Sequence, residues 1–432
     1  MLGLGGRLAK ASTRALLDYV KDGLKLYMPY RGDNITKGVQ FVGTGSTSFD
    51  GTNDYIVIAD SSDFDNQSFT ISAWVKLDEN DDYNGIFEHY SSNSGYNFFV
   101  NSNGKLRSYI GDGSGSNSLE ATTVLNTGQW YHCATTYTSG TRKIYLNGSE
   151  DKSATTSVTI AFASGNHTIG ETIDAYMDGN IDGVAIWDTA LDGDSIRAIW
   201  NNGNPTNLKN NTGAYDEYTD NLVAYYRCGD GTLDEYPLIG DEVTPTLGSD
   251  LIGDGTAEGS ASFPTWEGAG SESNTSYNST VSNSEDFANG GSKSFKVVND
   301  GGGDVMNFGH SLNESSLAGN IYKVTCDVYI PTTDGVDSNI TLRMLGTGGG
   351  EIQVVPDSGT NIALASTRDA WQSLIMYGQY VAHANSAIWN ISSPDTGASE
   401  IFYVDNISIK QVNGNAGMMT NMASEDIAED TP

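Results

Sequence analysis

The spacing of hydrophobic residues changes near Leu24. Before it, residues 7–23 ("RLAKASTRALLDYVKDG") place apolar side chains three or four positions apart, which predicts an amphipathic helix. After it, apolar and polar positions alternate in short segments separated by Asn, Gly and Ser turns, which is typical of antiparallel strands. A second short helix is predicted at residues 191–203, with Asp192 as N-cap and Gly203 as its stop.

The strand pattern divides the chain into two successive regions. In the first region strands are predicted within 68–79, 96–111, 129–148 and 179–188. Residues 221–231 partly repeat the pattern of 23–33 and predict a late strand that returns beside the first strand. In the second region strands are predicted at 292–300, 319–331, 339–346, 351–356, 370–382, 386–393 and 400–412.

The sequence therefore predicts an all-β protein with two antiparallel β-sandwich (jelly-roll) domains and a short N-terminal helix. The predicted parts are a helix (1–23), a first sandwich (24–231), a turn-rich linker (232–248), a second sandwich (249–412) and an extended tail without a strand pattern (413–432).

Two predicted strands contain an aspartate where an apolar residue is expected. In "FYVDNISIKQV" (402–412) the alternation is regular on both sides but slips by one position at Asp405 and Asn406. In "NIDGVAIW" (180–187) Asp182 stands at the head of an apolar run. Each carboxylate needs a partner, because an unpaired charge on a packed sheet is costly.

Charge and composition exclude several classes of function. The net charge is −33, so nucleic acid is not an expected partner, because phosphate binding needs Lys and Arg. Residues 1–31 hold six basic and two acidic residues, a net charge of +4, which leaves −37 on the remainder. The basic helix is therefore expected to dock on a partner or on its own domain.

The cysteines and the apolar stretches argue against disulfides, a membrane helix and a signal peptide. The three cysteines are far apart and form no CxxC pair, so they are predicted to be buried apolar residues rather than disulfides. No apolar stretch is long enough for a membrane helix, and "MLGLGGRLAKAST" lacks the apolar core of a signal peptide. We therefore expect synthesis in a cytosol and no membrane partner.

The first region resembles the laminin-G-like, concanavalin A-like lectin/glucanase family over roughly residues 24–203. The segments that carry the resemblance are "SFDGTNDYIVI", "FTISAWVKL", "GQWYHCATTYTSGTRKIYLNG" and "MDGNIDGVAIWDTALDGDSIRAIWNNG". The second region resembles carbohydrate-binding modules of the xylanase/cellulase type through an opening "GDGTAEG", a central "AWQSLIMYGQYVA" and a terminal "FYVDNISIKQV". Both resemblances imply sandwich folds that bind glycans.

Both resemblances also imply calcium, held by an aspartate at the start of the last sheet strand and by an early loop. In the second region the implied pair is Glu258 and Asp405; in the first, Asp182 is a weaker candidate, with Asp50 and Asp54 as the remaining ones. Calcium takes six to eight oxygen ligands, which carboxylates and loop carbonyls supply. The alternative is an aspartate that caps a turn through hydrogen bonds.

Catalytic patterns are missing from the predicted strands. Glycosidases need two carboxylates about 5–10 Å apart, and no strand of the first region alternates acidic residues. We therefore expect no enzyme activity. Aromatic side chains suit stacking on sugars, and the candidates for glycan binding are Tyr90, Tyr96, Phe99, Tyr109, Trp266 and Trp389.

The combination of a docking helix, lectin-like domains and no export signal is what a phage virion protein would show. The arrangement, with its "MLGLG" start and its "MMTNMASEDIAEDTP" end, resembles virion proteins of marine tailed phages. The predicted function is a tail appendage, fibre or capsid-surface protein that binds host surface glycans. Its expected partners are other virion proteins, reached through the N-terminal helix, and further copies of itself. The alternatives are a purely structural capsid decoration protein and a secreted polysaccharide-degrading enzyme.

Overall fold

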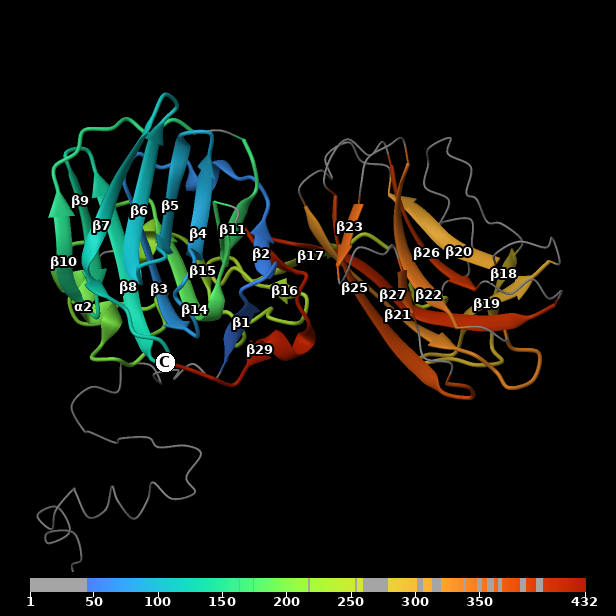
Figure 1. The fold of residues 1–432 in the computed structure, drawn as a ribbon. Helices are drawn as coiled ribbons and strands as arrows, with labels where there is room; N and C mark the ends of the chain where they lie inside the picture. The colour runs from blue at the N-terminus through green and yellow to red at the C-terminus, as the bar shows by residue number, and fades with distance from the viewer. Residues whose placement is uncertain are drawn as a thin grey trace, which may run out of the picture. The chain divides into compact units, whose positions relative to one another are not determined.

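The structure is a computed structural model in which the described residues form two β-sandwiches (Figure 1). It describes residues 45–432 except 163, 174, 217, 253–254, 259–278, 301–305, 313–319, 337–338, 348–351, 356–360, 364–366, 381–385 and 394–398. The predicted all-β fold class is confirmed. The predicted N-terminal helix (1–23) and the first predicted strand lie outside the described residues.

The first sandwich consists of sheets A and B, whose strands are antiparallel. In spatial order sheet A contains β10 (Ser149–Ala154), β9 (Thr141–Leu146), β8 (Trp130–Thr138), β3 (Phe69–Leu77), β14 (Asp178–Trp187), β1 (Ser46–Asp50) and β29 (Ile427–Ala428), and β15 (Leu222–Tyr226) also pairs with β14. Sheet B contains β16 (Leu238–Ile239), β28 (Gly417–Thr420), β2 (Tyr55–Ile58), β11 (His167–Ile169), β4 (Asn84–Ser91), β5 (Ser94–Val100), β6 (Lys105–Asp112) and β7 (Ser116–Val124). A small hairpin, β12 (Glu171–Thr172) and β13 (Ala175–Tyr176), follows β11.

The second sandwich consists of sheets C and D. Sheet C contains β18 (Ser279–Ser284), β19 (Ser294–Asn299), β27 (Ile401–Val412), β21 (Ile321–Tyr329), β25 (Trp371–Tyr380) and β23 (Ile352–Val355), and β17 (Leu247–Asp250) pairs with β27. Sheet D contains β20 (Met306–Leu312), β26 (Ser386–Ser393), β22 (Thr341–Thr347) and β24 (Asn361–Ala363).

The C-terminal residues return to the first sandwich. Strand β28 lies between β16 and β2 in sheet B, and β29 pairs with β1 in sheet A (Figure 1). Residues 413–432 therefore do not form the extended tail that the sequence predicts, and the predicted linker (232–248) contributes β16. These strands are two to four residues long, too short for a hydrophobic period to show.

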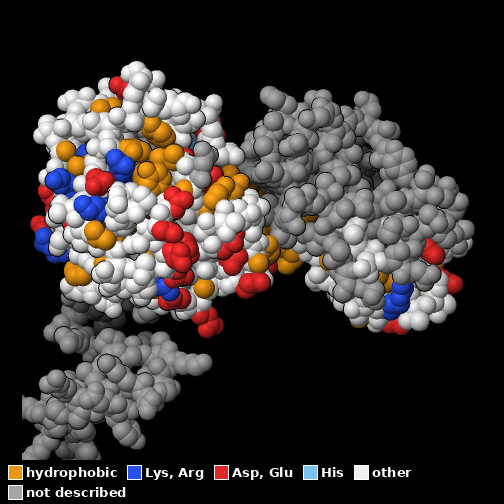
Figure 2. All heavy atoms as spheres, viewed as in Figure 1, with side chains coloured by type: hydrophobic (Ala, Val, Ile, Leu, Met, Phe, Trp, Pro, Cys, Tyr) orange, Lys and Arg blue, Asp and Glu red, His pale blue; other side chains and the backbone are white. Residues whose placement is uncertain are grey.

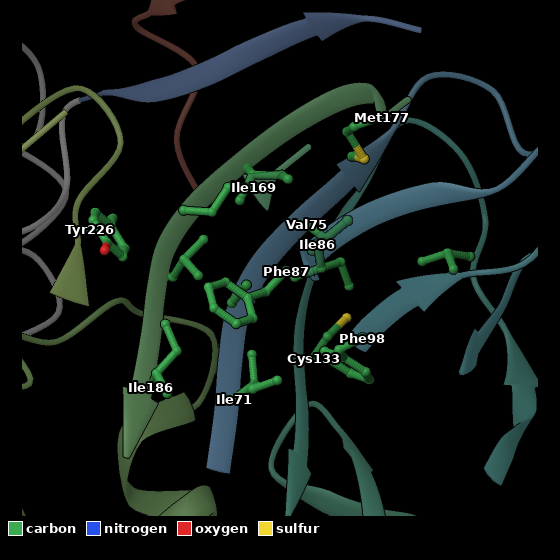
Figure 3. Packing of buried hydrophobic residues seen from close by; sticks show 14 of the residues in the cluster. Ile71, Val75, Ile86, Phe87, Phe98, Cys133, Ile169, Met177, Ile186 and Tyr226 are labelled. Carbon is green, nitrogen blue, oxygen red and sulfur yellow. The ribbon is translucent and has the colours of Figure 1, made fainter. Parts of the chain in front are cut away.

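The core of the first sandwich lies between sheets A and B. Ile71 and Val75 of β3 pack with Cys133 of β8 from one side, and Phe87 and Phe98 pack from the other (Figure 3). Each fully buried side chain of this size contributes about 1.5–3 kcal/mol of transfer free energy. All three cysteines are free and buried, as predicted.

The aspartates that interrupt the strand pattern lie at β-bulges. The pairing of β14 with β3 shifts register after Asp182, and Gly183 has a positive φ of 60°. The pairing of β27 with β21 shifts register next to Asp405, and Asn406 has a φ of 51°. An extra residue in a strand moves the alternation by one position, so the bulge accounts for the phase slip at Asp405.

The second predicted helix and the late strand at 221–231 are both present in the structure. Helix α2 (Gly193–Trp200) begins after Asp192, whose side chain accepts a hydrogen bond from the Ser195 N–H, so the predicted N-cap is confirmed. The helix ends at Asn201, in a left-handed conformation, before Gly203. Strand β15 lies within the predicted range 221–231 and pairs with β14, while residues 23–33, beside which it is predicted to lie, are outside the described residues. No helix among the described residues is long and apolar enough to cross a membrane.

Candidate functional site

The outer face of sheet B gathers polar and aromatic side chains on adjacent strands. Side chains alternate between the two faces of a strand, so the residues of β4–β7 that do not enter the core share this face. The register places Glu88, Asn97, Tyr109 and Ser118 opposite one another on β4, β5, β6 and β7. Figure 2 shows hydrophobic side chains beside basic ones over this part of the sandwich.

Tyr90 and Tyr109 present partly exposed rings on this face. Their ring centroids are 6.2 Å apart. The Arg107 guanidinium lies 5.2 Å from the centroid of the Tyr109 ring, within the range of a cation–π contact. Both rings come from strand residues, Tyr90 from β4 and Tyr109 from β6, and we call this pair the tyrosine platform.

Phe99 lies on the same face but is fully buried. Its ring is 5.4 Å from Tyr109 and 5.4 Å from Tyr83, centroid to centroid. Phe99 therefore supports the Tyr109 ring and does not offer a surface of its own. Because side chains alternate between the two faces of a strand, Phe98 and Phe99 cannot both enter the core, and Phe98 is the core residue.

Tyr96 is a correction to the predicted glycan-binding set. It is fully buried in the core, stacks on Phe69 at a centroid distance of 4.1 Å, and donates its hydroxyl to the Phe64 carbonyl at 2.8 Å. Burial raises the pKa of Tyr96 well above its ordinary value. A side chain in this position cannot contact a ligand on the outer face of sheet B.

Glu88 connects the outer face of sheet B to the β12–β13 hairpin. Its Oε2 accepts hydrogen bonds from Asn97 Nδ2 (3.3 Å), Thr172 Oγ1 (2.9 Å) and the Ile173 N–H (3.1 Å). Asn97 is fully buried beneath its neighbours, and no described residue donates to its Oδ1. Sequence reasoning missed Glu88, Asn97 and Arg107, and only Arg107, two positions before Tyr109 on β6, could have been found from a period-two spacing.

Glu88 and Glu120, two carboxylates on the strands of sheet B, are farther apart than a hydrolytic pair. Glu88 is on β4 and Glu120 is on β7, with β5 and β6 between them. Three strand spacings amount to about 14 Å, whereas a hydrolytic pair needs about 5–10 Å. Glu120 instead lies near two cations, 3.9 Å from Lys105 Nζ and 4.0 Å from Arg107 Nε.

Asp405 and Glu258, the predicted calcium pair, both face the segment 289–293. Asp405 Oδ2 accepts from the Asn289 N–H and Oδ1 from the Asn406 N–H, both at 2.8 Å. Glu258 Oε1 accepts from the N–H groups of Ser292 (2.6 Å) and Lys293 (2.7 Å). These hydrogen bonds match the alternative to calcium that the sequence left open, in which a carboxylate caps a turn.

The charges around Asp405 nonetheless suit a cation. Burial raises the pKa of the Asp405 carboxyl, and the carboxylates of Asp327 and Glu258 raise it further, against the two N–H donors that lower it. Asp327 stands opposite Asp405 and accepts from the side-chain amides of Asn289 (2.7 Å) and Asn406 (2.8 Å). Among the described residues no three acidic, His or Cys side chains converge as a metal site would require, so calcium at Asp405 and Glu258 stays a prediction.

Asp182 is buried with a different set of neighbours. Burial raises the pKa of Asp182 well above its ordinary value, and the Asp230 carboxylate adds to this effect. The Arg227 guanidinium, which pairs with Asp230 at 2.9 Å, and the Gly183 N–H lower it. The structure thus places Asp182 beside an ion pair inside the fold.

Asp50 and Asp54 organise the turn between β1 and β2. Asp50 Oδ1 accepts from the Thr52 N–H at 2.8 Å, and Asp54 Oδ2 accepts from the Asp50 N–H at 3.1 Å. Burial raises the pKa of Asp54 to about 6. Both carboxylates act as turn caps here.

The remaining predicted aromatics belong to the second sandwich. Trp266 lies outside the described residues. Trp389 is in β26, where the backbone is described but the side chain is not. The described aromatic cluster of this sandwich consists instead of Phe287, Tyr329, Trp371 and Tyr403.

Comparison with known proteins supports the identity of the first sandwich. Residues 50–197 match the model of the concanavalin A-like lectin/glucanases superfamily, described as Laminin_G_3. No curated protein matches the sequence.

Several solved structures are similar to part of the chain. A protein of proposed carbohydrate-binding function from Bacteroides ovatus is 21% identical with a TM-score of 0.36, over 46% of this chain and 56% of that one. Domain 4 of an extracellular arabinanase from Geobacillus stearothermophilus, in complex with arabinotriose, is 22% identical with a TM-score of 0.31, over 37% and 80%. A SAP-like pentraxin from Limulus polyphemus is 17% identical with a TM-score of 0.30, over 38% and 84%. The chain thus spans just over half the length of the first of these structures.

The family match falls on residues of the first sandwich. Residues 50–197 are thus similar to a concanavalin A-like lectin/glucanase (laminin G) domain.

Proposed function

We propose that the first sandwich binds a carbohydrate on the outer face of sheet B. The observation that carries this proposal is the pair of partly exposed tyrosine rings, Tyr90 on β4 and Tyr109 on β6, whose centroids are 6.2 Å apart across β5. Aromatic faces bury the apolar C–H face of a sugar ring, and partly exposed polar groups beside them, Glu88 and Arg107, can bond its hydroxyls. The match of residues 50–197 to a family named for lectins and glucanases supports the same function.

The charge of the protein favours a neutral glycan. The chain carries −33, and acidic groups dominate, so a polymer rich in uronate or sulfate groups would be repelled on approach. On the face itself Arg107 is accompanied by Glu120, which offsets its charge. The proposed ligand is therefore an uncharged oligosaccharide or polysaccharide.

Binding without hydrolysis is part of the proposal. Glu88 and Glu120 stand too far apart to act as an acid–base pair. Incubation with laminarin, xylan or the bound glycan should release no reducing sugar above the buffer level. Release that is lost in a Glu88→Gln variant would contradict this part of the proposal.

A glycan array with the full chain tests the binding function. We expect binding to at least one neutral glycan, a reduction of about tenfold or more for Tyr109→Ala, and normal binding for Tyr218→Ala. Tyr218 is a suitable control because it is a half-buried tyrosine that packs on Tyr215, in the cluster with helix α2. Equal binding by the Tyr109 and Tyr218 variants would contradict the proposed site.

We further propose that the protein displays this domain on a phage particle, as a tail appendage or a capsid-surface protein. The support comes from the sequence: residues 1–31 carry +4 on a chain of −33, which suits docking of the predicted helix on another virion protein. Deletion of residues 1–23 should leave both sandwiches folded and abolish incorporation into particles. Full incorporation of the truncated chain would place the docking surface elsewhere.

A further inference from the structure

The β12–β13 hairpin lies directly on the outer face of sheet B, next to the tyrosine platform. At Gly85 of β4 an added Cβ would lie 2.3 Å from the Glu171 carbonyl carbon, so β12 approaches β4 as closely as the absence of a side chain permits. The hairpin therefore forms a wall over Glu88 and Asn97, whose side chains both hydrogen-bond to Thr172 Oγ1. Tyr109 stands opposite Asn97 on the next strand, β6.

The tip of this wall carries an unusual residue. Ile173, directly after β12, has a positive φ of 44°, and its side chain is 42% exposed. A β-branched side chain is strained in this left-handed conformation, which Gly, Asn and Asp adopt at much lower cost. The turn would thus be more stable with another residue, and the isoleucine side chain contributes nothing to the core.

Glu88 fixes the strained tip relative to the platform. The Glu88 carboxylate accepts from the Ile173 N–H and from the Thr172 hydroxyl, and its third donor is Asn97, the residue opposite Tyr109. The position of the Ile173 side chain is therefore coupled to the same polar row that adjoins the tyrosine rings. Strain of this kind is held in place by its surroundings and is concentrated at functional sites.

We propose that Ile173 is a specificity-determining residue that contacts the glycan bound on Tyr90 and Tyr109. This inference rests on the proposed carbohydrate-binding function of that face. An isoleucine side chain offers no hydrogen bond, so a sugar hydroxyl turned toward it loses its water partners without replacement. A methyl group in the same place gains apolar contact. The ligand class is therefore a neutral sugar that turns a methyl group to the hairpin, as a 6-deoxy sugar does.

Matched sugar pairs and three variants of the full chain test the inference. The probes are glycans that end in L-fucose or L-galactose, and in L-rhamnose or L-mannose, because each pair differs in the 6-hydroxyl alone. The native chain should bind the deoxy member of at least one pair about tenfold more tightly. Ile173→Asn should lower this ratio to near one, whereas Ile173→Val should retain most of it.

The melting temperature of Ile173→Asn and the binding of Tyr109→Ala distinguish a failure of this inference from misfolding and from a failure of the proposed site. Asparagine adopts the left-handed conformation readily, so Ile173→Asn should melt at the same temperature as the native chain or higher. An unchanged deoxy preference in Ile173→Asn, or no preference in the native chain, overturns the inference about Ile173. If Tyr109→Ala weakens binding while Ile173→Asn changes neither affinity nor preference, only this inference fails. If neither variant affects binding, the proposed site fails with it.

Discussion

Both sandwiches carry a row of aromatic side chains on the outer face of a sheet, but the second row is buried at Tyr329 and Tyr403 and partly exposed at Trp371. In the first sandwich Tyr90 and Tyr109 are partly exposed. In the second, Trp371, Tyr329 and Tyr403 stand opposite one another on β25, β21 and β27. Phe287, from the segment before β19, stacks on Tyr329 at 4.3 Å and meets Tyr403 edge to face at 4.9 Å.

The difference lies in the loop rather than in the strands. Asp286 anchors this segment by accepting from the Tyr403 hydroxyl (3.2 Å) and from Lys296 Nζ (3.0 Å). Tyr403 is consequently 3% exposed. Aromatic side chains on the outer face of a sheet thus form a largely covered layer in the second sandwich and the proposed binding surface in the first, and the covering segment accounts for the difference.

The largest effect should follow from removing a ring of the covered row. Tyr403→Ala should destabilise the second sandwich by about 3 kcal/mol, because a buried aromatic ring and its contacts with Phe287 are lost. Tyr109→Ala should cost less than about 1 kcal/mol, because its ring is already partly in water. Urea unfolding followed by fluorescence measures both. Equal losses would show that the two rows are packed alike.

If Asp405 and Glu258 share a calcium ion, its removal should lower the free energy of unfolding of the second sandwich by a comparable amount. An ion at a hundredfold excess over its Kd stabilises the native state by about 2.7 kcal/mol. Chelation should then lower the melting temperature by several degrees, and Asp405→Asn should abolish that sensitivity. Asp182→Asn, in the first sandwich, should leave the sensitivity to chelator unchanged. A melting temperature that is identical with calcium and with chelator would show that Asp405 only caps its bulge.

A change of pH should have a smaller effect on the stability of the first sandwich. The pKa of Asp54 is about 6 in the folded protein and close to 3.8 when unfolded, so the folded state binds the proton more tightly. The stabilisation is complete below about pH 4 and is lost as pH rises through 6. Asp54→Asn should remove this part of the pH dependence of the melting temperature. Asp50→Asn, four residues earlier in the same turn, serves as the control, and an equal change in both variants would contradict the assignment.

The sequence predicted where strands and helices lie better than it predicted which strands pair. The alternation of apolar and polar residues identified β3, β14 and β27. The position of Asp192 before a short helical pattern identified the N-cap. Both signals depend on local spacing. It could not predict that β28 and β29 join the first sandwich, because pairing over such a distance leaves no local pattern.

The candidate site was predicted in part. Tyr90 and Tyr109 are on the platform, whereas Tyr96, one of the same group, belongs to the core. The residues on a strand alternate, but the pattern alone does not say which half faces inward. Glu88 and Asn97 required the cross-strand register, which only the structure supplies. The hairpin with Ile173 required a backbone angle that no residue pattern indicates.

The location of a bound sugar tests the central claim most directly. The measurement is a crystal structure of the full chain with the neutral oligosaccharide that binds best on the array. The account predicts a sugar ring stacked on Tyr109 or Tyr90, with its hydroxyls bonded to Glu88 or Arg107. A sugar bound on the second sandwich, or on the outer face of sheet A, would contradict it.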